Sequence, residues 1–178
     1  MNHQDHVNLL RDGIATRGGT WADFGSGTGA FTLALADLIG AEGQIFSVDK
    51  DRMALQEQAR ALKANFPDAR VTYQVGDLTR PLRESLPPLN GIVMANALHF
   101  IPDHQKDAVV QLLKSYLRPG ARLILVEYNA DRGNVWVPYP VSYPTWETIA
   151  RRNGFANVRL LATRPSRMLN AIYSAENW

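Results

Sequence analysis

The sequence of 178 residues contains no cysteine. This absence excludes disulfide bonds, thiolate metal sites and a cysteine nucleophile, and therefore also methylation of cytosine C5 through a cysteine adduct. No apolar run approaches the roughly 18 residues of a membrane span, and the polar residues 1–6 have no signal-peptide core. We therefore predict a cytoplasmic protein without a membrane span.

An excess of charge of one sign is also lacking. The formal net charge is only +2, although arginines are concentrated near the C-terminus. Such a small charge is not the electrostatic footprint of a nucleic-acid-binding protein, and the arginines are read as solvated side chains. Charge therefore argues against a nucleic-acid partner.

The chain length and the hydrophobic content of 46% fit one globular domain over residues 1–178. Strand and helix patterns alternate, which predicts an α/β sheet with helices on both faces. The expected strands are 20–24, 44–49, 70–75, 92–97, 122–127, 158–162 and 169–174. The expected helical stripes lie within 31–38, 55–66, 109–117 and 145–153. We expect residues 1–19 to form an N-terminal helix or lead-in, and residues 128–143, which lack a period, to form a long loop on the acceptor side.

The most informative motif is a turn with glycines at alternate positions, Gly25, Gly27 and Gly29, between an expected strand and a helix. Glycines let the backbone approach a ligand, and the first amides of the helix are free to face it. Asp49 ends the next strand, 24 residues beyond Gly25, where a βαβ unit places the carboxylate that binds a ribose. This spacing also satisfies the dinucleotide fingerprint, so a nicotinamide cofactor stays open at this point.

Four further features occur in the right order. Asp23 precedes the first glycine by two residues, Asp77 ends the third strand, and residues 90–100 and 117–126 carry a fourth strand and a helix-turn-strand. Together with the glycine turn they resemble the class I S-adenosylmethionine-dependent methyltransferases. The resemblance implies a Rossmann-like seven-stranded sheet of order 3-2-1-4-5-7-6 with an antiparallel last pair. It also implies S-adenosylmethionine as cofactor and S-adenosylhomocysteine as product.

The resemblance assigns roles to individual residues. The glycines would pass close to the methionine part of the donor, and Asp23 would help to hold its ammonium group. Asp49 would accept from both ribose hydroxyls, and Asp77 from the adenine amine. The full set of expected donor-binding residues is Asp23, Gly25, Ser26, Gly27, Gly29, Asp49, Lys50, Met53, Gly76, Asp77, Leu78, Ala95 and Asn96.

Methyl transfer also needs a placed nucleophile and a destination for its proton. His99 follows the fourth strand and is the best-placed base, with Glu127 and Tyr128 at the end of the fifth strand as further catalytic candidates. Four aromatic residues within an eleven-residue stretch predict an acceptor wall or lid. They are Trp136, Tyr139, Tyr143 and Trp146. We assign no metal, because the turn between His99 and His104 does not support a shared site.

A small-molecule acceptor fits these features best. Asn96 is followed by Ala-Leu-His, whereas methylases of nucleic-acid amino groups carry Pro-Pro and an aromatic residue there. Protein or RNA methylation stays an alternative. From other classes, a noncatalytic S-adenosylmethionine-binding partner protein would have the same motifs, and a nicotinamide-dependent oxidoreductase is opposed by the lack of a Tyr-x-x-x-Lys pair.

Overall fold

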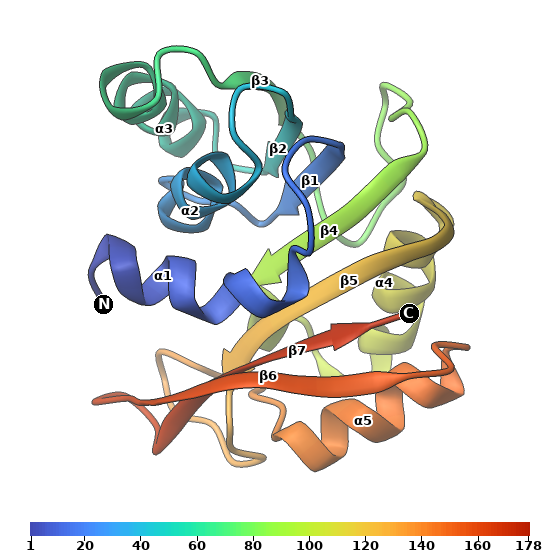
Figure 1. Ribbon diagram of the computed structural model, residues 1–178. Helices are drawn as coiled ribbons and strands as arrows, with labels where there is room; N and C mark the ends of the chain where they lie inside the picture. Colours follow the sequence, from blue (N-terminus) through green and yellow to red (C-terminus); the bar gives the residue numbers. More distant parts are fainter.

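The computed structural model describes residues 1–178 and contains one seven-stranded sheet between two layers of helices (Figure 1). The strands are β1 (Thr20–Phe24), β2 (Gln44–Asp49), β3 (Arg70–Val75), β4 (Leu89–Ala95), β5 (Leu117–Tyr128), β6 (Val158–Pro165) and β7 (Ala171–Asn177). The helices are α1 (His3–Leu10), α2 (Ala30–Ile39), α3 (Arg52–Asn65), α4 (Asp103–Ser115) and α5 (Tyr143–Arg152), with short 3-10 turns at Arg11–Gly13 and Leu98–Phe100.

The strand order is β3-β2-β1-β4-β5-β7-β6, which confirms the order expected from the sequence. The first five strands pair in parallel, and β7 runs antiparallel between β5 and β6. β1 pairs with β2 on one side and with β4 on the other, so the strand order reverses there. Ligands of open α/β sheets bind beyond the carboxyl ends of the strands at such a reversal.

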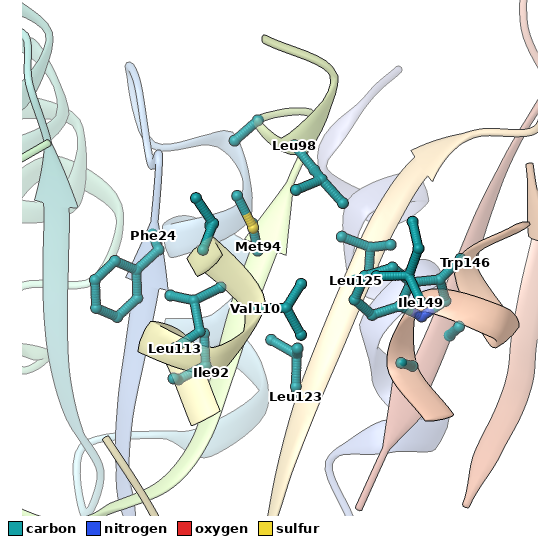
Figure 2. Close-up of a cluster of buried hydrophobic side chains, with 14 of the residues drawn as sticks. Phe24, Ile92, Met94, Leu98, Val110, Leu113, Leu123, Leu125, Trp146 and Ile149 are labelled. Carbon is teal, nitrogen blue, oxygen red and sulfur yellow. The ribbon is translucent and has the colours of Figure 1, made fainter. Parts of the chain in front are cut away.

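Two hydrophobic clusters form the core, one on each face of the sheet. On one face, α4 and α5 pack on inward side chains of the central strands, among them Ile92, Met94, Leu123 and Leu125 (Figure 2). On the other face, α1, α2 and α3 cover the alternate side chains of the same strands. Neither layer contains a helix that is both long and apolar enough to cross a membrane.

The fifth strand begins earlier than the sequence indicated. We expected Leu117 in a helix and the strand at 122–127, but Leu117 already pairs with Leu89 of β4. The Pro119-Gly120 pair lies inside β5, where the register with β4 shifts, and Gly120 has a φ of +76°. The residues that signal a chain break in the sequence therefore form an irregularity within the strand.

Expected boundaries of four other elements also need correction. β4 ends at Ala95 and not at 97, because Asn96 has a φ of +52° and turns the chain out of the sheet. α5 starts at Tyr143 and not at 145, since the side chain of Ser142 caps it and Pro144 fits its first turn. The final hairpin is antiparallel as expected, but β6 extends to Pro165 and β7 covers Ala171–Asn177.

Candidate functional site

A cleft of about 550 Å³ opens at the carboxyl ends of β1, β2, β3 and β4. It brings together eight of the residues expected to bind the donor: Gly25, Gly27, Asp49, Lys50, Gly76, Asp77, Leu78 and Asn96. Six further lining residues had no donor-binding role in the prediction from the sequence: Thr79, Ala97, Phe100, Ile101, Pro102 and Gln105. All of them except Thr79 lie in the ten residues after β4. The position of this segment after a strand that ends at the cleft is the sequence signal that could have identified them.

The five other expected donor residues do not line this cleft. Met53 lies on α3 with 66% of its surface exposed, and Ala95 is buried at the end of β4. Asp23, just before the glycine turn, and Ser26, within it, are buried. Gly29, the last residue of the turn, faces the side chain of Gln58 in the protein interior. Their effect on a ligand would therefore be exerted through the turn or at its edge.

The three glycines of the turn have different surroundings, although all have positive φ angles. A side-chain carbon added at Gly27 would meet nothing within 4 Å, so this glycine faces open space. At Gly25 it would lie 2.5 Å from the Cβ of Ala97, and at Gly29 it would lie 2.3 Å from the Cγ of Gln58. Protein atoms thus exclude a side chain at Gly25 and Gly29, whereas the space at Gly27 is open; Gly25 and Gly27 both line the cleft.

The two carboxylates of the cleft are held by backbone amides. Asp49 accepts from the amide of Gly27 at 2.8 Å and from that of Asp51 at 2.9 Å. Asp77 accepts from the amide and the hydroxyl of Thr79. The amide of Thr79 contributes most to lowering the pKa of Asp77. Each carboxylate is fixed in orientation and still has lone pairs for a ligand.

Asn96 carries an acceptor without a partner. Its Oδ1 atom is buried and accepts no hydrogen bond within the protein, and its residue lines the cleft. An unpaired buried oxygen is costly, and the cost is removed when a ligand donates to it. Asp49 and Asp77 offer further acceptor oxygens in the same cleft, which therefore suits a ligand that carries hydrogen-bond donors, such as ribose hydroxyls and an ammonium group.

Asp23 is buried at the end of β1. Its Oδ2 atom accepts from the hydroxyl of Thr32 at 2.6 Å. Burial raises the pKa of its carboxyl from 3.8 to about 7; the hydroxyl of Thr32 opposes this shift, and the charge of Asp49 adds to it. Asp23 therefore changes charge near neutral pH beside the turn.

The three catalytic candidates lie together although the sequence did not indicate that they pair. Nδ1 of His99 lies 2.8 Å from Oε1 of Glu127, and both side chains are buried. Glu127 also accepts from the backbone amides of His99 and Tyr128. Because the carboxylate only accepts, Nδ1 carries the proton, and Nε2 is left as the basic atom of the ring.

Tyr128 packs against the same histidine, with ring centroids 5.6 Å apart. Burial, followed by the charge of Glu127, raises the pKa of its phenol above the usual value of 10. The phenol thus stays protonated at neutral pH and forms an aromatic side of the pair. His99 is the one side chain of the three with a free basic atom.

The four aromatic residues expected in an acceptor wall are separated in the structure. Trp136 and Tyr139 lie in the loop after β5 and are 73% and 41% exposed. The amide of Tyr139 donates to the carbonyl of His99, so this part of the loop lies beside the histidine. Trp146, a residue of α5, points into the core (Figure 2) and is wholly buried. Its indole donates to Asn177. Tyr143 packs edge-on against Tyr173. Trp146 is a core residue and cannot form part of an acceptor wall. Tyr143 packs against the same core cluster.

Comparison with known families decides what this arrangement is. A family model described as a methyltransferase domain matches residues 22–120, which is more than half of the chain and includes the turn, the cleft carboxylates and His99. The chain belongs to this methyltransferase family. The expectation of a class I S-adenosylmethionine-dependent methyltransferase is thereby confirmed.

Similar proteins extend the comparison of this methyltransferase domain. The chain is 27% identical over 166 residues to carboxy-S-adenosyl-L-methionine synthase of Pseudoalteromonas atlantica, which covers 91% of this chain and 65% of that protein. Among solved structures, magnesium protoporphyrin IX methyltransferase of Synechocystis PCC 6803 with bound SAM has a TM-score of 0.72 at 19% identity, covering 98% of this chain and 76% of that one.

A third similar protein is an arsenic(III) S-adenosylmethionine methyltransferase of Chlamydomonas reinhardtii, with a TM-score of 0.71 at 18% identity over 92% of this chain and 64% of that one. At such identities the solved structures show a shared fold. The chain spans less than two thirds of the length of the curated relatives it matches.

Proposed function

We propose that this methyltransferase domain transfers a methyl group from S-adenosylmethionine to a small-molecule acceptor. The observation that carries the donor assignment is the cleft at the strand reversal, where Gly27 leaves open space and Asn96 holds an unpaired buried oxygen. Bound there, the donor supplies an electrophilic methyl group on a positively charged sulfur. A cytoplasmic location and a single domain stay predictions of the sequence.

The lining residues suit the separate parts of this donor. Asp49 is already oriented by two amides and has lone pairs for the ribose hydroxyls. Asp77, ionised and held by Thr79, would accept from the adenine amine. Oδ1 of Asn96 would accept from the ammonium group, which relieves its unpaired burial.

The charge of the cleft favours this donor over a carboxylated one. Relatives of the chain are named carboxy-S-adenosyl-L-methionine synthases, so a ligand with an extra carboxylate, formed as a product in the cleft, is the nearest alternative. The lining contains two carboxylates, Asp49 and Asp77, and only one cation, Lys50. Such a lining attracts the positive charges of S-adenosylmethionine and offers little to an added carboxylate.

On the acceptor side, we propose that His99 takes the proton of the nucleophile at Nε2. Glu127 fixes the ring through Nδ1 and stabilises the imidazolium that forms. Phe100 lines the cleft directly after His99, which does not line it itself, and the amide of Tyr139, in the loop that also bears Trp136, donates to the carbonyl of His99. These aromatic groups support a small organic acceptor with an ionisable hydroxyl, thiol or amine. Protein or RNA methylation stays an alternative.

Removing the Asp49 carboxylate tests the ribose assignment. Asp49→Ala is expected to weaken S-adenosylhomocysteine binding at least about tenfold, because hydrogen bonds to a charged group contribute roughly 1.5 to 3 kcal/mol each. Isothermal calorimetry measures the affinity, and Asp68→Ala, at an exposed aspartate outside the cleft lining, is the control. Unchanged affinity in a folded Asp49→Ala protein would remove Asp49 from the donor site.

The exposed aromatic residues should serve the acceptor and not the donor. The double variant Trp136→Ala, Tyr139→Ala is expected to bind S-adenosylhomocysteine as the wild type does and to melt within about 2 °C of it, since exposed side chains contribute little to stability. Trp146→Ala, in the core, is the contrasting control and should melt far lower. A tenfold loss of donor affinity in the double variant would place these aromatics at the donor instead.

A further inference from the structure

Gln58 is a fully buried amide that belongs to none of the donor motifs. It lies on α3, on the side of the glycine turn opposite to the cleft. Its Oε1 accepts from the hydroxyls of Ser47 at 3.0 Å and Ser26 at 3.3 Å, and its Nε2 donates to the hydroxyl of Thr32. The side chain of Gln58 is thus hydrogen-bonded to Ser26, within the glycine turn, and to Thr32, at the start of α2.

The same side chain also fills the space that Gly29 leaves. A side-chain carbon at Gly29 would lie 2.3 Å from the Cγ of Gln58, closer than atoms can pack. Ser26 directs its hydroxyl to this interior network, with Ser47 2.7 Å away, and not to the cleft. The turn is therefore enclosed between Gln58 on its inner side and the open space at Gly27 on its outer side.

We infer that Gln58 is a positioning residue for donor binding, which holds the turn of residues 25–29 in the shape that exposes the Gly27 backbone to the cleft. This inference rests on the proposed donor site. Gln58 does not reach the cleft lining, so it would act through Ser26 and Thr32. An apolar side chain of equal length would fill the same space. The hydrogen bonds of the amide are therefore the contribution of Gln58 that packing alone cannot supply.

The hydrogen bonds of Gln58 continue through Thr32 to Asp23, which is expected to bind the methyl donor. Thr32 accepts from Gln58 and donates its own proton to Asp23. The hydroxyl of Thr32 can make this bond in one orientation only, and the amide of Gln58 selects that orientation. Gln58 thereby also fixes the carboxylate of Asp23 at the start of the turn.

The test is Gln58→Met, which retains length and packing at Gly29 but removes all three polar contacts. S-adenosylhomocysteine affinity is expected to fall about tenfold, as the loss of a set of orienting hydrogen bonds predicts. Gln56→Met, the same change at an exposed position of the same helix, should bind as the wild type does. Hydrogen exchange at the amides of Gly27 and Gly29 should accelerate in Gln58→Met while exchange in the central strands stays unchanged.

Ser26→Ala provides a second variant that leaves the core side chains in place. If Gln58 acts through Ser26, the single change should weaken binding a few fold, and the double variant should bind no more weakly than Gln58→Met, so that the two effects are not additive. If Gln58→Met does not fold, the Ser26→Ala single variant alone tests the role, and wild-type affinity in that variant overturns it.

The outcomes separate the inference from the donor site on which it rests. Wild-type protein that does not bind S-adenosylhomocysteine contradicts the proposed function. Wild-type protein that binds, with Gln58→Met or Ser26→Ala binding equally well, leaves the proposed function intact and overturns the positioning role. A lowered melting temperature with unchanged affinity and exchange at the turn would mark Gln58 as a packing residue and would likewise overturn it.

Discussion

His99→Asn is expected to lower turnover at least about a hundredfold, the lower end of what a general base contributes. Asparagine has a similar reach but no basic atom, so it removes Nε2 while the core around the pair is retained. The effect requires an acceptor that must lose a proton, and turnover is measured with one identified from a panel of phenols, thiols and amines. S-adenosylhomocysteine affinity should stay within twofold of the wild-type value.

The matched control for this experiment is His104→Asn, since His104 is an exposed histidine on α4. It should react at the wild-type rate. Glu127→Gln should lower turnover as well, because the amide no longer stabilises an imidazolium at His99. A His99→Asn protein that turns the acceptor over at the wild-type rate would mean that proximity alone carries the reaction and that the buried pair is structural.

Asp23→Asn is expected to raise the free energy of unfolding relative to the wild type as the pH rises, and to remove the rise of donor affinity with pH. The folded-state pKa of Asp23 is raised to about 7 from an ordinary value of 3.8, so the folded protein binds more protons than the unfolded chain between these values. The contribution of Asp23 to stability is therefore greatest at low pH and is lost as the pH rises to about 7. Asparagine at this position does not titrate.

The stability advantage of Asp23→Asn over the wild type should therefore grow by up to about 1.4 kcal/mol per pH unit between pH 5 and pH 7, and should be constant above it. Chemical denaturation at several pH values measures this difference. Over the same range, wild-type affinity for S-adenosylhomocysteine should rise with pH, because the ionised carboxylate attracts the ammonium group, and the variant should lose this trend. A stability difference that is flat from pH 5 to pH 8 would contradict a raised pKa at Asp23.

The sequence predicted the fold well because the expected strands are short, apolar and bounded by clear turns. β1 and β3 match their expected residues, and the glycine turn and Asp49 indicated where the strand order reverses. The predicted start of the fifth strand after Pro119-Gly120 was wrong, since a Pro-Gly pair gives the same sequence pattern whether it separates a helix from a strand or interrupts a strand. Cross-strand pairing with Leu89 decided between these, and pairing is not visible locally.

The site was predictable where a motif fixes the backbone and unpredictable where side chains meet from distant elements. Asp49, Asp77 and Asn96 follow strands that end at the reversal, so their convergence follows from topology. The pairing of His99 with Glu127 depends on the register of β4 with β5, and the role of Gln58 depends on which side of α3 faces Gly29. Trp146 shows the converse error: its aromatic neighbours in sequence suggested a pocket, but the helical turn directs it into the core.

Calorimetric titration of the wild-type protein with S-adenosylhomocysteine, and separately with NADH, shows which of the two ligands the cleft binds. We expect saturable binding of S-adenosylhomocysteine at one site per chain and no binding of NADH, because the cleft combines Asp49 and Asp77 with open space at Gly27 and an unpaired Asn96 oxygen. Binding of NADH with no response to S-adenosylhomocysteine would contradict this expectation.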